Sequence, residues 1–297
     1  MTNAPRARYR HHLSVVVTAW TGVDELERCL TSLSSQLDPD LDEVIVACNF
    51  DLAAGHALGS AVAIDPPPAR SATVPQLRAA GLLASDGAVV AFIEDHCVAA
   101  PGWRDALMRA HSGLFDVVGG PVGLARGGRP LDWAVYFYDY GRFAPPMISG
   151  PVDSLSGTNM SFARWFLDDA EERWYREVHE TALRDEVRHQ RLTMYLDAGA
   201  VVIHGARRPA RHAVPLAFHL ARGFAGRRVS QASRLRRAGF AATTPLLPFL
   251  LGSRIVIAVV RRRRELGRLA AALPWLAVLL AAWSAGECAG YLWGVGD

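Results

Sequence analysis

The 297-residue sequence predicts an α/β fold in which a mostly parallel sheet is flanked by helices. Two observations support this prediction. Short apolar runs alternate with amphipathic segments of helical length through the first 120 residues. In addition, residues 88–93 are six consecutive apolar residues, which is typical of a strand buried on both faces of a sheet. Strands joined by helices of ordinary crossover length form parallel sheets with right-handed connections.

The elements follow in a regular order. Strands are expected over residues 13–20, 43–49, 61–64, 88–93, 116–120 and 200–204. Helices are expected over residues 24–37 and 73–84, from residue 102 onward, and within the polar segment 167–192. In the first helix, apolar residues recur at helical spacing: Leu26, Cys29, Leu30 and Leu33. In the second, Pro75 stands in the first turn, where proline is tolerated.

Residues 121–160 break this pattern. The segment is rich in glycine, proline and aromatic side chains: Trp133, Tyr136, Phe137, Tyr138, Tyr140 and Phe143. Packing within a connecting segment is favoured for most of these side chains. A flexible lid over an acceptor site is the alternative.

Composition limits the class of protein. A chain that is 51% hydrophobic is large enough for one α/β domain and an appendage. Its four cysteines are scattered without CxxC spacing, which favours neither a zinc site nor a disulfide framework and indicates a reducing compartment. The basic N-terminus has no apolar segment behind it, so no cleaved secretory signal is expected.

Charge is strongly segregated along the chain. Residues 1–197 carry a net charge of −9 and residues 198–297 carry +12, with nine arginines in residues 207–237. A basic segment followed by apolar sequence indicates a membrane surface or another polyanion as partner. Nucleic acid is not expected, because the arginine-rich segment lacks interleaved aromatic side chains for base stacking.

The last sixty residues are largely apolar. Residues 269–286 are uncharged, and at about 1.5 Å per residue they nearly span a hydrocarbon core of about 30 Å.

The earlier stretch 238–260 is interrupted by Pro245, Pro248 and Arg254. If both stretches crossed the membrane, the four arginines at 261–264 would lie opposite the catalytic domain, against the positive-inside rule. The first stretch is therefore predicted to be interfacial or re-entrant. The second is predicted to be a single span or a helix lying in the membrane. A soluble helical hairpin is the alternative.

Three charged or polar residues directly follow the buried strand. Glu94, Asp95 and His96 stand where an open α/β sheet places its ligands, at the carboxyl end of a strand. Two carboxylates and an imidazole are ligands for a divalent cation such as Mg²⁺ or Mn²⁺. An ordinary polar turn is the alternative interpretation.

Three segments together resemble glycosyltransferase family 2, whose members have the GT-A nucleotide-sugar fold. The segments are FIEDHCVAAPGW at 92–103, SGTNMSFAR at 156–164 and the stretch 179–204. The family's Asp-x-Asp-like motif and Pro-Gly-Trp turn correspond to EDH and residues 101–103. Its G-x-N-x-x-F segment corresponds to residues 157–162. Its acidic helix start, followed by a strand that ends in histidine, corresponds to Glu180 and His204. The resemblance covers roughly residues 13–205.

The resemblance implies an inverting, metal-dependent transfer of a sugar from a nucleotide-sugar donor. It places the divalent cation at Glu94, Asp95 and His96, and the histidine in this set favours Mn²⁺ over Mg²⁺. Glu180 would be the general base that deprotonates the acceptor hydroxyl. The remaining implied contacts are Thr18, Ala19, Asn49 and Arg78 to the nucleotide, Trp103 and Asn159 to the acceptor, and His204 to the diphosphate.

The expected organisation has four parts. They are a basic tail at 1–12, a GT-A-like catalytic domain at 13–205, an arginine-rich segment at 206–237 and an apolar membrane-associated region at 238–297. The expected acceptor is a lipid-linked or cell-surface glycan, and the catalytic domain is expected on the cytoplasmic side of the membrane. The departure from Asp-x-Asp leaves a catalytically inactive membrane-docking module as an alternative. A nucleotidyltransferase is a further alternative, although the sequence after the first strand offers one glycine and two acids in place of a basic phosphate loop.

Overall fold

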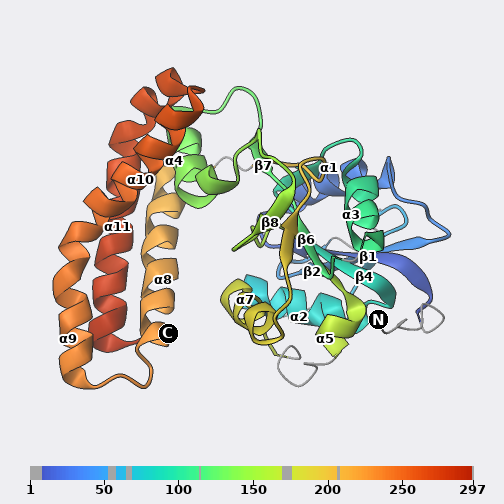
Figure 1. Ribbon diagram of the computed structural model, residues 1–297, viewed down its shortest axis with the longest axis horizontal. Coiled ribbons are helices and arrows are strands. Elements are labelled where there is room, and N and C mark those ends of the chain that lie inside the picture. The colour runs from blue at the N-terminus through green and yellow to red at the C-terminus, as the bar shows by residue number, and fades with distance from the viewer. Residues whose placement is uncertain are drawn as a thin grey trace. The chain divides into compact units, whose positions relative to one another are not determined.

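The computed structural model describes residues 9–52, 58–64, 69–113, 115–168, 176–205 and 208–295. Most of the predicted basic tail 1–12 and the first two residues of segment 206–237 lie outside these ranges. The chain divides into two compact units (Figure 1). Unit 1 contains Met1–Gly123 and Phe143–Ala206, and unit 2 contains Leu124–Arg142 and Arg207–Asp297. Residues 124–142 therefore belong with the C-terminal helices, which differs from the predicted domain 13–205.

Unit 1 is built on an eight-stranded sheet with the order β3-β2-β1-β4-β9-β6-β10-β8. Its strands are β1 (His11–Ala19), β2 (Asp42–Cys48), β3 (Val62–Ala63), β4 (Gly87–Glu94), β6 (Val117–Gly119), β8 (Gly150–Val152), β9 (Asn159–Ala163) and β10 (Met194–Leu196). β8 and β9 run antiparallel to their neighbours, and the other pairs are parallel. The predicted class, a mostly parallel sheet flanked by helices, is confirmed.

A smaller sheet has the order β5-β11-β7. Its strands are β5 (Cys97–Ala99), β11 (Val202–His204) and β7 (Val122–Leu124). β11 pairs antiparallel with β5, and the register places His204 opposite Cys97. Because β5 begins three residues after β4 ends, this pairing places His204 beside the segment that follows the buried strand.

Among the described residues of unit 1, the helices that connect these strands are α1 (Val23–Ser34), α2 (Val74–Ala84), α3 (Trp103–Ser112), α5 (Arg164–Asp168) and α7 (Glu180–His189). α2 begins with a capping box in which the Thr73 backbone N–H donates to the Gln76 side chain at 2.9 Å. A Cβ at Gly81 would lie 2.2 Å from a methyl carbon of Val16, so only glycine allows α2 to pack this closely on β1. This close packing fixes the position of Arg78, one turn earlier on the same helix.

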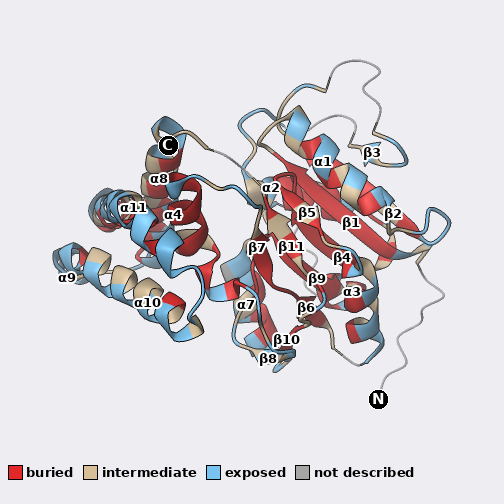
Figure 2. Cartoon of the chain, turned by 90° about the horizontal axis from the view of Figure 1, so that it is seen from above, coloured by how far each residue is buried: buried red, intermediate tan, exposed pale blue. Residues whose placement is uncertain are grey.

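The core of unit 1 lies around β1 and β4, which Figure 2 shows as almost entirely buried. The β-branched run Val15–Val17 is fully buried, as are Phe92 and Ile93. Each fully buried side chain of this kind stabilises the fold by about 1.5–3 kcal/mol relative to exposure. The two strands therefore form a rigid base for the loops at their carboxyl ends.

Unit 2 is helical. Its elements are α4 (Pro130–Asp139), the 3₁₀ turn η2 (Gly141–Phe143), α8 (Ala210–Arg228), α9 (Arg234–Thr243), the 3₁₀ turn η3 (Thr244–Leu246), α10 (Leu247–Arg262) and α11 (Leu266–Trp293). α4 was not predicted, because its aromatic residues obscure any apolar periodicity. Pro130 starts the helix, and Asp132 accepts a hydrogen bond from the Arg129 backbone N–H at 2.9 Å. The aromatic side chains of α4 pack mainly within unit 2, as the packing interpretation predicts.

Small residues allow α8 and α11 to approach closely. A Cβ at Gly286 would lie 2.2 Å from the Phe218 carbonyl oxygen, and one at Gly290 would lie 2.4 Å from the Arg222 carbonyl oxygen. These two glycines are four residues apart, the spacing of close-packed helix pairs in membranes. Glu287, between them, is 6% exposed and accepts hydrogen bonds from Trp283 Nε1 at 2.5 Å and Tyr291 Oη at 2.7 Å. The Glu287 carboxylate is thus buried and hydrogen-bonded within α11.

Two helical stretches of unit 2 are long and apolar enough to cross a membrane. They are Arg234–Arg262, formed by α9, η3 and α10, and Leu266–Trp293, formed by α11. The prolines predicted to interrupt the first stretch lie in η3 and the first turn of α10, so helical structure continues through them. At the turn between the two stretches, Arg262 donates to the carbonyl of Gly141 at 2.6 Å. The arginine-rich turn therefore packs against the end of the segment that carries α4.

Candidate functional site

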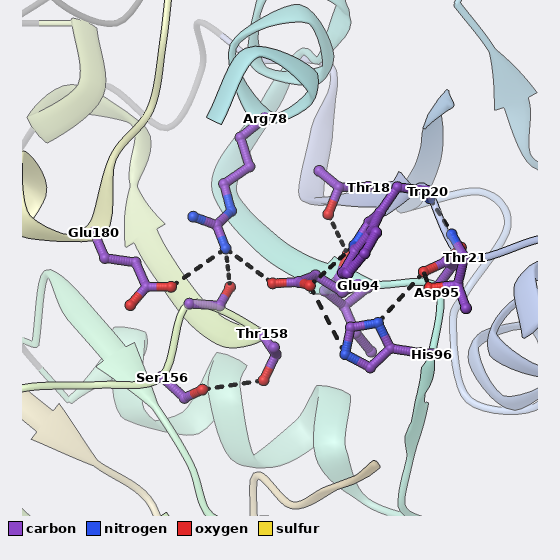
Figure 3. Close-up of polar contacts among 12 residues, drawn as sticks. Thr18, Trp20, Thr21, Arg78, Glu94, Asp95, His96, Ser156, Thr158 and Glu180 are labelled. Carbon is purple, nitrogen blue, oxygen red and sulfur yellow. Dashed lines mark hydrogen bonds and ion pairs between the residues drawn. The ribbon is translucent and has the colours of Figure 1, made fainter. Parts of the chain in front are cut away.

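The candidate site lies at the carboxyl ends of β1 and β4. These two strands are parallel neighbours, and their register places Thr18 opposite Glu94. The acids predicted to bind a cation thus meet the loop that follows β1, which is residues 20–22. Figure 3 shows this convergence of side chains from β1, α2, β4 and α7.

Asp95 holds the loop after β1. Its Oδ2 accepts the backbone N–H groups of Thr21 at 2.7 Å, Trp20 at 2.9 Å and Gly22 at 3.4 Å, and its Oδ1 accepts the Thr21 hydroxyl at 2.9 Å. The side chain is fully buried. Both carboxylate oxygens are therefore engaged by the protein. Asp95 therefore fixes the loop after β1, and its predicted role as a cation ligand stays a prediction.

Glu94 and His96 are arranged differently. Glu94 Oε2 accepts the Trp20 indole N–H at 3.2 Å and lies 3.8 Å from His96 Nε2. Both side chains are at least nine-tenths buried. The His96 ring packs edge-on against Trp20, with centroids 5.7 Å apart, and against His204, with centroids 4.9 Å apart. The structure thus brings His204 beside the cluster, and its contact with a diphosphate stays a prediction.

The fit of these residues to a divalent cation follows from that geometry. Among the described residues, no group of three or more His, Cys, Asp and Glu side chains is arranged to hold a metal ion. However, cations of this kind are commonly held by one or two protein ligands together with substrate phosphates. Glu94 Oε2 and His96 Nε2 lie 3.8 Å apart, so a shift of less than about 1 Å brings them to the roughly 3 Å that separates adjacent ligands of one ion with bonds of about 2.1 Å. Glu94 and His96 are thus the two residues of the predicted set that can share a cation after this shift, and the role of Asp95 as a ligand stays a prediction.

Arg78 lies inside the cluster rather than in solvent. Its side chain is 3% exposed, and its Nη2 donates to Glu94 Oε1 at 3.1 Å and to the Gly157 carbonyl at 3.0 Å. The same nitrogen lies 3.5 Å from Glu180 Oε1. The guanidinium therefore joins two carboxylates that come from β4 and α7 (Figure 3).

Glu180 is brought to the site by contacts between its own segment and α2. The Val178 backbone N–H donates to the Pro75 carbonyl at 2.8 Å, and Gln76 Nε2 donates to Glu177 Oε1 at 3.3 Å. These bonds tie the start of α7 to the first turn of α2. The N-cap residue of α7, His179, makes no side-chain capping bond, and the Glu180 carboxylate points to Arg78 (Figure 3).

Trp103 and Asn159, predicted to bind the acceptor, are fully buried. Trp103 Nε1 donates to Asn159 Oδ1 at 2.9 Å, and Asn159 Nδ2 donates to the carbonyls of Ala200 at 2.7 Å and Pro121 at 3.3 Å. Their polar groups are thus satisfied within the protein. In the structure they join α3 and β9 to the loops before β7 and β11, and their contact with an acceptor stays a prediction.

The other predicted nucleotide contacts lie at the end of β1 and after β2. Thr18 and Ala19 are fully buried, and the Ala19 carbonyl accepts the Asn49 backbone N–H at 3.1 Å. Asn49 is partly exposed, and its Nδ2 donates to the Ala72 carbonyl at 2.9 Å. Thr18 and Ala19 are thus closed off from solvent in the structure, and the contacts of Thr18, Ala19 and Asn49 with a nucleotide stay predictions.

Sequence reasoning missed the loop residues Trp20 and Thr21. Trp20 donates to Glu94 and Asp95, and Thr21 donates twice to Asp95. The signal that could have found them is their position directly after the first strand, at the same sheet edge as the acids. A carboxylate at such an edge can accept hydrogen bonds from nearby backbone N–H groups as well as bind a cation.

The cysteine next to the cluster is a packing group. Cys97 is fully buried, and burial together with the negative charge of Glu94 raises the pKa of its thiol. A thiol held in its protonated form is a poor nucleophile and a poor metal ligand. The chemistry available at this site therefore comes from the carboxylates, the imidazoles and Arg78.

Comparison with known proteins supports the fold. No protein-family model matches the sequence, and no curated protein matches it. Among solved structures, the chain is similar to the mannosyltransferase PcManGT from Pyrobaculum calidifontis, determined in complex with GDP-Man and Mn²⁺. The match covers 96% of this chain and 89% of that chain, with a TM-score of 0.54 and 15% sequence identity. The chain thus has a glycosyltransferase-like fold.

Proposed function

We propose that the protein is a nucleotide-sugar-dependent glycosyltransferase of the family 2 type that inverts the configuration at the transferred sugar. The observation that carries this proposal is the convergence of Glu180 with the pair Glu94 and His96 at the carboxyl ends of β1 and β4. Such an edge is where open α/β sheets bind ligands. The glycosyltransferase-like fold supports the choice of reaction class.

In the proposed reaction, the acceptor hydroxyl attacks the anomeric carbon from the face opposite the departing nucleoside diphosphate. Glu180 accepts the proton of that hydroxyl as the new bond forms. Its side chain is half-exposed, so an acceptor can reach it. Asp95 keeps the loop 20–22 in place for the nucleotide through its four hydrogen bonds.

Glu94 and His96 would hold a divalent cation, which supplies charge neutralisation for the leaving diphosphate when bound. His96 favours Mn²⁺ over Mg²⁺ in this pair. PcManGT, which shares the fold, was determined with Mn²⁺ and GDP-Man. His204, beside His96, remains a proposed contact of the diphosphate.

The first prediction concerns donor use. We expect the full-length protein to hydrolyse slowly at least one member of a panel of UDP-, GDP- and TDP-sugars when Mn²⁺ is present. Chelation of the cation is expected to reduce this turnover by at least tenfold, and added Mn²⁺ should restore it more fully than Mg²⁺. Release of nucleoside diphosphate in a coupled assay measures the rate. No release from any donor, with or without cation, would contradict the proposed activity.

We further propose that unit 2 attaches the protein to a membrane and that the acceptor is lipid-linked or at the cell surface. Two helical stretches of sufficient length support attachment. Large apolar side chains are exposed along them, including Leu235 at 85%, Phe249 at 78% and Leu246 at 66%. Patches of this kind mark contact with lipid or protein. The basic residues of unit 2 suit an anionic, cytoplasmic leaflet.

The second prediction is that the full-length protein stays in the membrane pellet after alkaline carbonate washing and is released by detergent. Deletion from residue 238 onward is expected to give an aggregating product instead of a soluble domain. The reason is that the deletion removes α11, which packs on α4 within unit 2. The aromatic side chains of α4 would then be exposed to solvent. Sedimentation with and without detergent measures both. Full-length protein in the supernatant without detergent would contradict membrane attachment.

A further inference from the structure

Arg78 occupies an unusual position between two carboxylates. Its side chain is 3% exposed, and its Nη2 donates to Glu94 Oε1 at 3.1 Å and to the Gly157 carbonyl at 3.0 Å. The same nitrogen lies 3.5 Å from Glu180 Oε1. Because one nitrogen contacts two carboxylates and a carbonyl oxygen, the positions of Glu94, Gly157 and Glu180 depend on one another. Because α2 is fixed on β1 by the close approach at Gly81, the guanidinium is held by the core of unit 1.

Gly157 provides the space for this arrangement. A Cβ at this position would lie 1.6 Å from Glu180 Oε1, 2.3 Å from Glu180 Cδ and 2.6 Å from Arg78 Nη2. Separations under 3 Å are not possible between non-bonded heavy atoms of this kind, so any side chain at 157 would displace the carboxylate. The Glu180 carboxylate therefore rests directly over the backbone of Gly157, in a seat closed on one side by Arg78.

The two members of the ion pair differ in freedom. The side chain of Arg78 is 3% exposed, whereas that of Glu180 is 50% exposed. A half-exposed glutamate loses rotamer entropy when it is held in one orientation. The buried charge of Arg78 and the flat surface at Gly157 supply the restraint that turns the carboxylate into the site.

We propose that Arg78 is a positioning residue for the transfer reaction, which acts by holding the Glu180 carboxylate in the seat over Gly157. This inference rests on the proposed function and on Glu180 as its base. It differs from the sequence-based prediction that Arg78 contacts the nucleotide. A phosphate contact contributes chiefly to donor affinity, whereas a positioning residue contributes to turnover at saturating donor.

The test is a double-mutant cycle in the full-length protein with Arg78→Gln, Glu180→Gln and the double variant. We expect Arg78→Gln to lower kcat for transfer by about 10- to 100-fold, the cost of misplacing a reacting group by about 1 Å. The donor dissociation constant, measured by calorimetry, should change by less than about threefold. Because Arg78 acts through Glu180, the double variant should be no slower than Glu180→Gln alone. Arg78→Lys should recover part of the lost turnover.

Three further variants test whether the loss of turnover comes from misfolding. Gly157→Ala retains Arg78 and is expected to lower kcat by the same mechanism, whereas Gly150→Ala, whose Cβ would meet nothing within 4 Å, should leave kcat unchanged. Arg104→Gln removes a comparable ion pair with buried Asp42 outside the site and should also leave kcat unchanged. A tenfold weaker donor affinity with normal kcat in Arg78→Gln would overturn the inference. So would a kcat of the double variant that is lowered by the product of the two single effects, because the residues would then act independently.

An error in the proposed function would give a different experimental result from an error in the role of Arg78. If the wild-type protein turns over no donor, the reaction class is wrong, and the seat is then checked by thermal unfolding of the same four proteins. A seat predicts that the effects of Arg78→Gln and Glu180→Gln on unfolding are non-additive. Additive effects in that experiment would overturn the seat independently of any activity.

Discussion

Glu180→Gln is expected to reduce transfer by about 10²- to 10⁴-fold, the usual contribution of a general base. Glutamine keeps the shape of the side chain but cannot accept the acceptor's proton. The Glu180 carboxylate lies 3.5 Å from Arg78 and has half of its surface exposed, so the substitution leaves the buried part of the site intact. Donor affinity should therefore remain within about threefold of the wild-type value.

Initial rates at saturating donor and acceptor, together with calorimetric titration of the donor, measure both quantities. Asp185→Asn is the matched control, because it removes one negative charge from the same helix at a side chain that is 69% exposed. The control should transfer sugar at the wild-type rate. Equal rates for Glu180→Gln and the control would remove Glu180 from the reaction.

Asp95→Ala is expected to destabilise the protein and to abolish donor binding together. The substitution leaves the backbone N–H groups of Trp20, Thr21 and Gly22 without their acceptor. Buried donors left unsatisfied cost about 1–3 kcal/mol each, so a total on the order of 3 kcal/mol is expected. For a unit of this size, that loss corresponds to a fall in Tm of about 6–12 °C.

Thermal unfolding monitored by circular dichroism measures the stability, and calorimetry measures the donor affinity. Asp105→Ala is the control, because that carboxylate is 66% exposed and its ion pair with Arg104 lies on the surface of α3. The control should shift Tm by less than about 2 °C, as is usual for exposed ion pairs. An Asp95→Ala protein with normal Tm and normal donor affinity would show that the loop does not depend on this carboxylate.

Much of unit 1 could be predicted because its elements depend on local patterns. The buried run at 88–93 and the β-branched run of the first strand have one stable placement, at the centre of a sheet covered on both faces. The helix α2 was similarly marked by Pro75 in its first turn. The acid cluster at the end of β4 followed from strand direction alone, since side chains after parallel strands meet at one edge.

The parts that could not be predicted depend on contacts between distant segments. Periodicity did not reveal α4, because nearly all of its residues are apolar or aromatic and pack on several sides. The different roles of Glu94 and Asp95 depend on which of them accepts the backbone N–H groups of the loop 20–22, and adjacent acids in a sequence carry no such information. The burial of Trp103 and Asn159 depends on their mutual hydrogen bond, between residues 56 apart in the chain.

The seat of Glu180 illustrates the same limit. The match of Gly157 to a family motif marked the residue, but not the reason for a glycine there. That reason is the space taken up by a carboxylate from α7 and a guanidinium from α2. The role of Gly157 becomes clear only when the positions of its own segment, α2 and α7 are known.

The measurement that tests the account most directly is a crystal structure of the full-length protein with a nucleoside diphosphate and Mn²⁺. Anomalous scattering from manganese locates the ion without reference to the interpretation of the site. We predict a peak within bonding distance of Glu94 Oε2 and His96 Nε2, with the diphosphate completing its coordination at the carboxyl ends of β1 and β4. A nucleotide bound elsewhere on unit 1, or manganese bound away from both of these atoms, would contradict the account.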